Sequence, residues 1–151
     1  MKILLSPAKK MKMTDACPVS QQHLSEPPLH AQALEIARLL KECTLPELGK
    51  VLGASGATLQ HAATLYHQFA TGMQPDQAAL FAYTGTAYTA LNPISLSSDT
   101  LQFAQDHLRI LSGLYGILRP FDRIEEYRLD VGNKLKIDEY KNLYDFWRDP
   151  V

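Results

Sequence analysis

The chain lacks most of the patterns that mark metalloproteins and cofactor-dependent enzymes. Its 151 residues include only two cysteines, Cys17 and Cys43, and neither belongs to a CxxC pair. The spacing therefore supports neither a zinc site nor a redox dithiol. The five histidines form no HxxxH or HExxH pair, and no His/Asp/Glu cluster has the spacing of metal ligands. We expect no metal and no cofactor.

Long apolar runs and a strong net charge are also missing. The apolar runs are too short to cross a bilayer, and residues 1–6 are too few for a signal peptide, so a cytoplasmic location without membrane contact is expected. The net charge of −1 argues against an unselective nucleic-acid binder. Residues 1–13 nevertheless carry four lysines and no acid, so a basic patch needs these lysines folded beside other cations.

What the sequence does contain is typical of one globular α/β domain over residues 1–151, with 46% hydrophobic and 21% charged residues. Short apolar runs predict a buried strand at 2–5 and a second strand at 78–83. Between them, apolar residues at helical spacing predict an all-helical block over residues 29–72. Thr44 and Glu47 form a capping box at the start of one of its helices.

The first strand ends at Ser6-Pro7-Ala8-Lys9, which places a hydroxyl and an ammonium at a strand end. Ligands of α/β sheets usually bind at such ends. The spacing formally matches the SxxK pattern of serine acyl-transfer enzymes, but the SDN and KTG companion motifs are absent. An ordinary surface loop and an anion-binding loop both remain open.

The richest stretch runs from Asp106 to Gly132 and holds three glycines and four arginines. We expect a helix over 99–111, a hairpin over 112–116 and a short second helix from Ile117, a helix-hairpin-helix-like element spanning 99–120. Backbone N–H groups around such a hairpin can converge on one phosphate. Pro120 limits the length of the second helix.

Several segments in fixed order resemble one family. They are LLSPAK (4–9), YTGTAYTAL (83–91), FAQDHLRILSGLYGILRPFD (103–122), YRLDVG (127–132) and LYDFW (143–147). The chain resembles the bacterial YaaA peroxide-stress proteins. This resemblance implies an α/β fold with a helix-hairpin-helix and a basic cleft, nonspecific binding of duplex DNA, and a role in limiting iron-linked damage by hydrogen peroxide. Family members continue beyond the position of Val151, so the chain is expected to be an incomplete N-terminal portion.

Three functional interpretations follow, and the sequence leaves them open. In the first, no residue is catalytic and DNA phosphates are bound by a set of hairpin and basic residues: Lys9, Arg109, Ser112, Gly113, Gly116, Arg119 and Arg128. In the second, an enzyme acts on a nucleotide or damaged base in the same cleft, which would gather Ser6, Lys9, Tyr115, Arg128 and Asp130, with Asp122 as another candidate acid. In the third, the arginines pair with neighbouring acids and the glycines serve a structural turn. The sequence predicts no oligomeric state.

Overall fold

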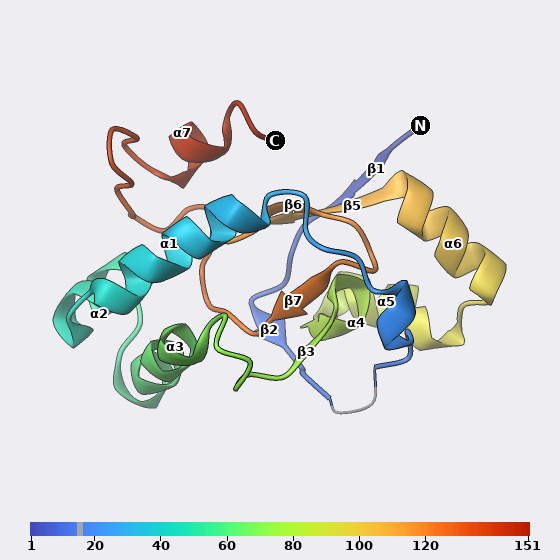
Figure 1. Cartoon of the computed structure of the whole chain (residues 1–151), viewed down its shortest axis with the longest axis horizontal. Coiled ribbons are helices and arrows are strands. Elements are labelled where there is room, and N and C mark those ends of the chain that lie inside the picture. The colour runs from blue at the N-terminus through green and yellow to red at the C-terminus, as the bar shows by residue number, and fades with distance from the viewer. Residues whose placement is uncertain (15–16) are drawn as a thin grey trace. The chain divides into compact units, whose positions relative to one another are not determined.

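The structure is a computed structural model that describes residues 1–14 and 17–151. These residues form seven α-helices and three small sheets, which confirms the predicted mixed α/β class (Figure 1). Contacts divide the chain into two compact units, each built from three separate segments. The strand-rich unit comprises Met1–Pro28, Pro75–Ser112 and Ile117–Glu126. The helical unit comprises Leu29–Gln74, Gly113–Gly116 and Tyr127–Val151.

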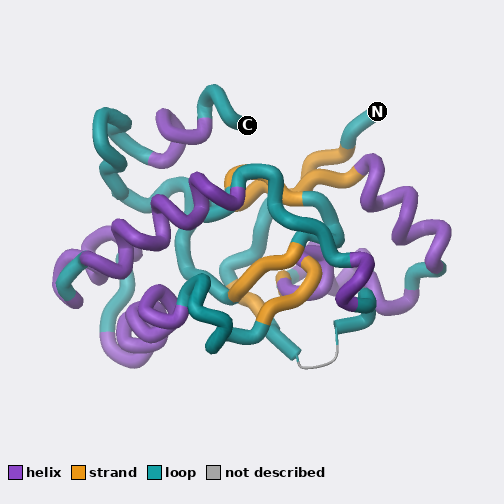
Figure 2. Tube along the Cα trace, viewed as in Figure 1, coloured by secondary structure: helices purple, strands orange, loops and turns teal. Residues whose placement is uncertain are grey.

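The strand-rich unit contains the sheets, drawn in orange in Figure 2. Strand β1 (Ile3–Leu5) runs parallel to β5 (Leu108–Ser112), and β5 is also hydrogen-bonded to β6 (Gly116–Leu118). The other two sheets are antiparallel pairs, β2 (Lys10–Met11) with β4 (Tyr83–Thr84) and β3 (Asp76–Ala78) with β7 (Arg123–Glu125). The helical elements of this unit are η1 (Gln21–His23), α4 (Ala79–Ala82), α5 (Thr86–Leu91), η2 (Pro93–Ser95) and α6 (Ser98–His107).

The helical unit confirms the predicted helical block. Its helices are α1 (His30–Glu42), α2 (Leu45–Leu52), α3 (Gly56–Gln68) and α7 (Leu143–Trp147). The capping box forms as predicted: Glu47 N–H donates to the Thr44 hydroxyl at 3.5 Å, and Thr44 N–H donates to the Glu47 carboxylate at 2.7 Å. Hydrogen bonds from the Thr44 backbone and hydroxyl hold the pKa of Glu47 below its usual value. Gly53 ends α2 in the left-handed conformation.

Two strand predictions need correction. Residues 3–5 do form a strand, but it lies at the edge of its sheet, and the side chains of Ile3 and Leu4 are 44% and 64% exposed instead of buried. The predicted strand at 78–83 is mostly helix α4, with strand residues only at its two ends. Alanine and leucine are good helix formers, and they occupy the middle of this run.

The predicted helix-hairpin-helix is wrong. Helix α6 ends at His107, and the segments expected to form both arms of the hairpin are the strands β5 and β6. Along β5, Leu108, Ile110 and Ser112 are buried while the residues between them are half-buried, the alternation typical of a strand. The backbone partners of β5 come from β1, so contacts distant in sequence decide its conformation.

Within the described residues, no helix is both long and apolar enough to cross a membrane. The same residues contain no group of three or more His, Cys, Asp or Glu side chains placed to hold a metal ion.

Candidate functional site

A short basic segment lies in the strand-rich unit, where β2 pairs with β4. Lys10 stands opposite Thr84 in this pairing, and Lys12 N–H donates to the Ala82 carbonyl at 2.8 Å. Lys9, Lys10 and Lys12 are all exposed, and among the described residues their ammonium groups make no hydrogen bond or ion pair. We call these three lysines the basic segment.

A buried glutamine fixes the backbone of this segment. Gln77 is 1% exposed, and its amide nitrogen donates to the Lys12 carbonyl at 2.6 Å and to the Phe81 carbonyl at 3.0 Å. Its amide oxygen accepts from the Thr14 hydroxyl at 3.1 Å. Hydrogen bonds in a buried setting are costly to break, so the lysines extend from a rigid support.

The strand-end loop at residues 6–9 lies next to α5. The Tyr88 hydroxyl donates to the Ser6 carbonyl at 2.9 Å, and the ring of Tyr88 packs against Tyr83 with centroids 5.5 Å apart. Gly85, with φ of 141°, approaches Ala8 so closely that an added Cβ would lie 3.3 Å from the alanine Cβ. Two motifs distant in sequence, residues 6–9 and 83–91, are thereby brought together in one unit.

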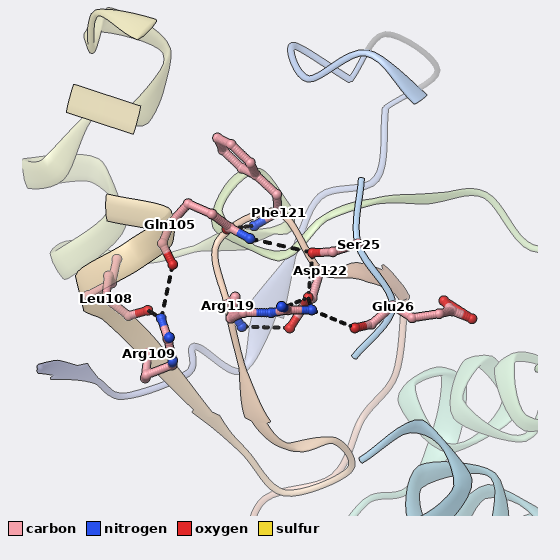
Figure 3. A network of polar contacts seen from close by, with 8 residues as sticks. All are labelled: Ser25, Glu26, Gln105, Leu108, Arg109, Arg119, Phe121 and Asp122. Atoms are coloured by element: carbon pink, nitrogen blue, oxygen red, sulfur yellow. Dashed lines mark hydrogen bonds and ion pairs between the residues drawn. The ribbon is translucent and has the colours of Figure 1, made fainter. Parts of the chain in front are cut away.

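Asp122 organises a second polar cluster in the same unit (Figure 3). Its side chain is fully buried, and Oδ1 accepts hydrogen bonds from the Ser25 hydroxyl at 2.6 Å and from Arg119 Nε at 3.0 Å. Oδ2 accepts from the Arg119 backbone N–H at 2.7 Å. The Arg119 guanidinium also donates to the Glu26 carbonyl at 2.9 Å. The carboxylate is therefore neutralised and hydrogen-bonded as a buried charge requires.

Arg109 also has internal partners. Its Nη1 donates to the Gln105 carbonyl at 3.0 Å and to the Leu108 carbonyl at 2.7 Å (Figure 3). The Gln105 side chain in turn accepts from the Phe121 N–H at 2.8 Å. Arg109 and Arg119 are both half-buried and hold neighbouring backbone in place, so fewer of their donors remain for an external phosphate than in an exposed arginine.

The remaining predicted DNA-binding residues have different environments. Ser112 is 5% exposed at the end of β5. Gly113 belongs to the helical unit, where a Cβ would meet the Leu129 carbonyl oxygen at 2.6 Å; its own carbonyl accepts from the Trp147 indole at 2.9 Å. At Gly116, which has a φ of 71°, an added Cβ would lie 2.8 Å from the Trp147 ring. Both glycines permit a close approach of backbone and ring.

Arg128 is exposed in the helical unit, and its carbonyl accepts from the Tyr66 hydroxyl at 2.7 Å. Burial raises the pKa of this tyrosine far above its usual value. The structure thus brings Lys9, Arg109, Ser112 and Arg119 into the strand-rich unit, and Gly113, Gly116 and Arg128 into the helical unit. The assignment of these seven residues to DNA binding stays a prediction.

The residues of the alternative enzyme are divided in the same way. Ser6 and Lys9 belong to the strand-rich unit, whereas Tyr115, Arg128 and Asp130 belong to the helical unit. No described basic side chain makes a hydrogen bond to the Ser6 hydroxyl, so an activated serine nucleophile has no support. Lys10 and Lys12 were not among the predicted site residues, although the four-lysine cluster at the start of the chain was the signal for them.

The family described as "Peroxide stress protein YaaA" matches residues 1–151, the whole chain. The chain belongs to this family. Three relatives of this YaaA family chain, all named UPF0246 protein, show how much of the family length it represents.

The relative from Caulobacter vibrioides (strain NA1000 / CB15N) is 37% identical over 151 residues, which cover 100% of this chain and 58% of the relative. The one from Alteromonas mediterranea is 41% identical over 156 residues, with the same coverages. The one from Lacticaseibacillus paracasei is 40% identical over 150 residues, covering 97% of this chain and 58% of the relative. This YaaA family chain thus spans less than three fifths of the length of these relatives.

Proposed function

We propose that this YaaA family chain takes part in the peroxide stress response as a nonspecific DNA-binding protein. The basic segment carries the proposal, because Lys9, Lys10 and Lys12 are exposed, lack partners among the described residues and extend from backbone fixed by Gln77. Lysine ammonium groups bind phosphates as point charges and need no base-specific geometry. The expected ligand is duplex DNA of any sequence.

The proposed contact differs from a helix-hairpin-helix, which the strands β5 and β6 replace. Arg109 and Arg119 act mainly as positioning residues. Arg109 donates to the carbonyls of Gln105 and Leu108, and the Arg119 side chain donates to the Asp122 carboxylate and the Glu26 carbonyl. Protein bound along DNA restricts access of iron and peroxide to the sugar-phosphate backbone. Protection of DNA from iron-linked oxidation is the role that this binding supports.

The experiment is a titration of fluorescently labelled duplex DNA at several salt concentrations. Each neutralised phosphate contributes about −0.9 to the slope of log K against log salt, so three lysines contribute about −2.7. The triple variant Lys9→Gln, Lys10→Gln and Lys12→Gln is expected to lose this part of the slope. A matched control replaces three exposed lysines of the helical unit, Lys50, Lys134 and Lys136, by glutamine.

The control variant is expected to keep most of the salt slope, although it removes the same charge. Equal losses in the two variants would mean that only the net charge matters and that the basic segment is no binding surface. If the affinity of the wild-type chain for DNA does not depend on salt, the proposal that the chain binds DNA phosphates is wrong.

A further inference from the structure

The strand-rich unit contains a pocket of about 310 Å³, and Lys12 of the basic segment is one of the residues that line it. This volume lies at the lower end of the range of small-molecule sites, about 300–1,000 Å³. The walls come from α4, β4, α5 and η2, together with Lys12, Thr14, Pro18 and Asn92. A single small ligand is therefore the appropriate occupant by size.

Several residues that line the pocket are apolar or aromatic. Leu80, Tyr83 and Tyr88 are buried, and Phe81 is half-buried. Ile94 lies at the pocket in an exposed position, with 78% of its surface accessible to water. Apolar groups that surround a concave site favour a flat, weakly hydrated body such as a ring.

The polar groups of the pocket favour an anion. Lys12 contributes a positive charge, and Thr84 and Thr89 contribute hydroxyls, whereas the Thr14 hydroxyl already donates to Gln77. Asn92 adds an amide, which offers both donors and an acceptor, the combination needed to recognise the edge of a base.

The pocket is also preorganised. Gln77 and Ala82 fix the backbone of Lys12 from two sides, and the Tyr88 hydroxyl is anchored on the Ser6 carbonyl. Asn92 adopts the left-handed conformation, with φ of 45°, which ends α5 and begins η2. A site whose walls are already held in place loses little entropy when a ligand binds.

We infer that this pocket binds a single nucleotide unit, with the base against the apolar lining residues and one phosphate on Lys12 and the hydroxyls of Thr84 and Thr89. The same chemistry is present in a free nucleoside monophosphate and in an unpaired nucleotide of a DNA strand. The inference rests in part on the proposed function, because Lys12 belongs to both the basic segment and the pocket.

Free AMP is the first probe, titrated into the 151-residue chain with backbone amide NMR as the readout. Saturable binding with a dissociation constant of about 1 mM or tighter is expected, with shifts centred on residues 83–94. Lys12→Gln is expected to weaken AMP about tenfold, the loss of one charge-assisted contact. The double variant Lys9→Gln and Lys10→Gln changes the basic segment outside the pocket lining, so it is expected to leave AMP binding unchanged.

Two charge-matched variants on α5 locate the site. Thr89 lines the pocket and Thr86 does not, although both are exposed residues of α5. Thr89→Glu is expected to abolish AMP binding by placing a carboxylate where the phosphate lies, whereas Thr86→Glu retains it. Equal AMP affinity in these two variants would overturn the assignment of the pocket.

The second probe is a hairpin DNA with one unpaired adenine, compared with a fully paired hairpin. A preference for the unpaired adenine that is lost in Thr89→Glu but kept in Thr86→Glu identifies a DNA strand as the source of the nucleotide. AMP binding without this preference identifies the free nucleotide. Absence of both overturns the inference, whereas loss of paired-DNA binding with intact AMP binding removes only the proposed function.

Discussion

Removal of the buried carboxylate of Asp122 is expected to destabilise the chain strongly. Its two oxygens accept from the Ser25 hydroxyl, the Arg119 side chain and the Arg119 backbone N–H, at 2.6 to 3.0 Å. Asp122→Ala leaves these donors without an acceptor in a fully buried position. The Arg119 guanidinium, whose side chain is 35% exposed, then lacks its counter-charge.

The size of the effect follows from burial. Breaking one partner of a buried ion pair costs about 3–5 kcal/mol, so we expect a loss in this range for Asp122→Ala. Asp122→Asn keeps the shape but turns one acceptor into a donor that faces other donors, which costs about 1–3 kcal/mol. The matched control is Asp76→Ala, which breaks the partly exposed ion pair of Asp76 with Arg123, 3.2 Å long, and is expected to cost at most about 1 kcal/mol.

Urea unfolding followed by far-UV circular dichroism measures these differences. With an m value of about 2 kcal/mol/M, a loss of about 4 kcal/mol moves the unfolding midpoint of Asp122→Ala down by about 2 M. The m values of the variants are compared first, because a changed m value would signal a different unfolding transition. If Asp122→Ala and Asp76→Ala lower the unfolding midpoint equally, the polar cluster around Asp122 is not a structural centre of the strand-rich unit.

Two further predictions concern Gly113, which was predicted to bind DNA, and the edge strand β1, which was predicted to be buried. Gly113→Ala is expected to lower the melting temperature clearly, because the new Cβ would lie 2.6 Å from the Leu129 carbonyl oxygen. Gly132→Ala, whose new Cβ has its nearest contact at 3.4 Å, is expected to change the melting temperature little. Equal melting temperatures of the two variants would contradict this reasoning. Leu4→Lys at the open edge of β1 is expected to reduce concentration-dependent self-association in sedimentation velocity, while Ile94→Lys, another exposed apolar site, does not. A wild-type chain that stays monomeric at high concentration would refute the second expectation.

The helices over residues 29–72 could be predicted because their signals are local. Apolar spacing defines the buried face of α1, and the Thr44 capping box and Gly53 mark the two ends of α2. Each of these signals lies within one or two turns of the residues it affects. In this block the tertiary contacts agree with the local helical preferences and do not override them.

The region from Leu108 to Leu118 could not be predicted in this way. Leucine and isoleucine at 108, 110 and 111 suit a helical continuation of α6 as well as a strand, and the choice depends on the pairing of Leu108 with Ile3. The exposure of β1 could not be predicted for a similar reason, because an apolar run does not reveal whether a strand has one neighbouring strand or two. Local periodicity cannot report a partner a hundred residues away.

The site shows a similar division. Lys9 and the lysine-rich start of the chain were visible in the sequence, but the role of Gln77 in fixing them was not, because its partners lie near residues 12–14. The sequence shows Arg119 as a cation, but its ion pair with Asp122, three residues later, depends on a tight turn between them. Charge can be counted from a sequence, whereas its availability depends on contacts.

The pairing of β1 with β5 also has a consequence for synthesis of the chain. Ile3 leaves the ribosome long before Leu108, its partner, has been translated. At an elongation rate of about 5–20 residues per second, the segment Ile3–Leu5 waits roughly 5–20 s for its only strand neighbour among the described residues. During that interval its apolar side chains are open to chaperones and to other nascent chains, so β1 pairs with its sheet neighbour only late in synthesis of this segment.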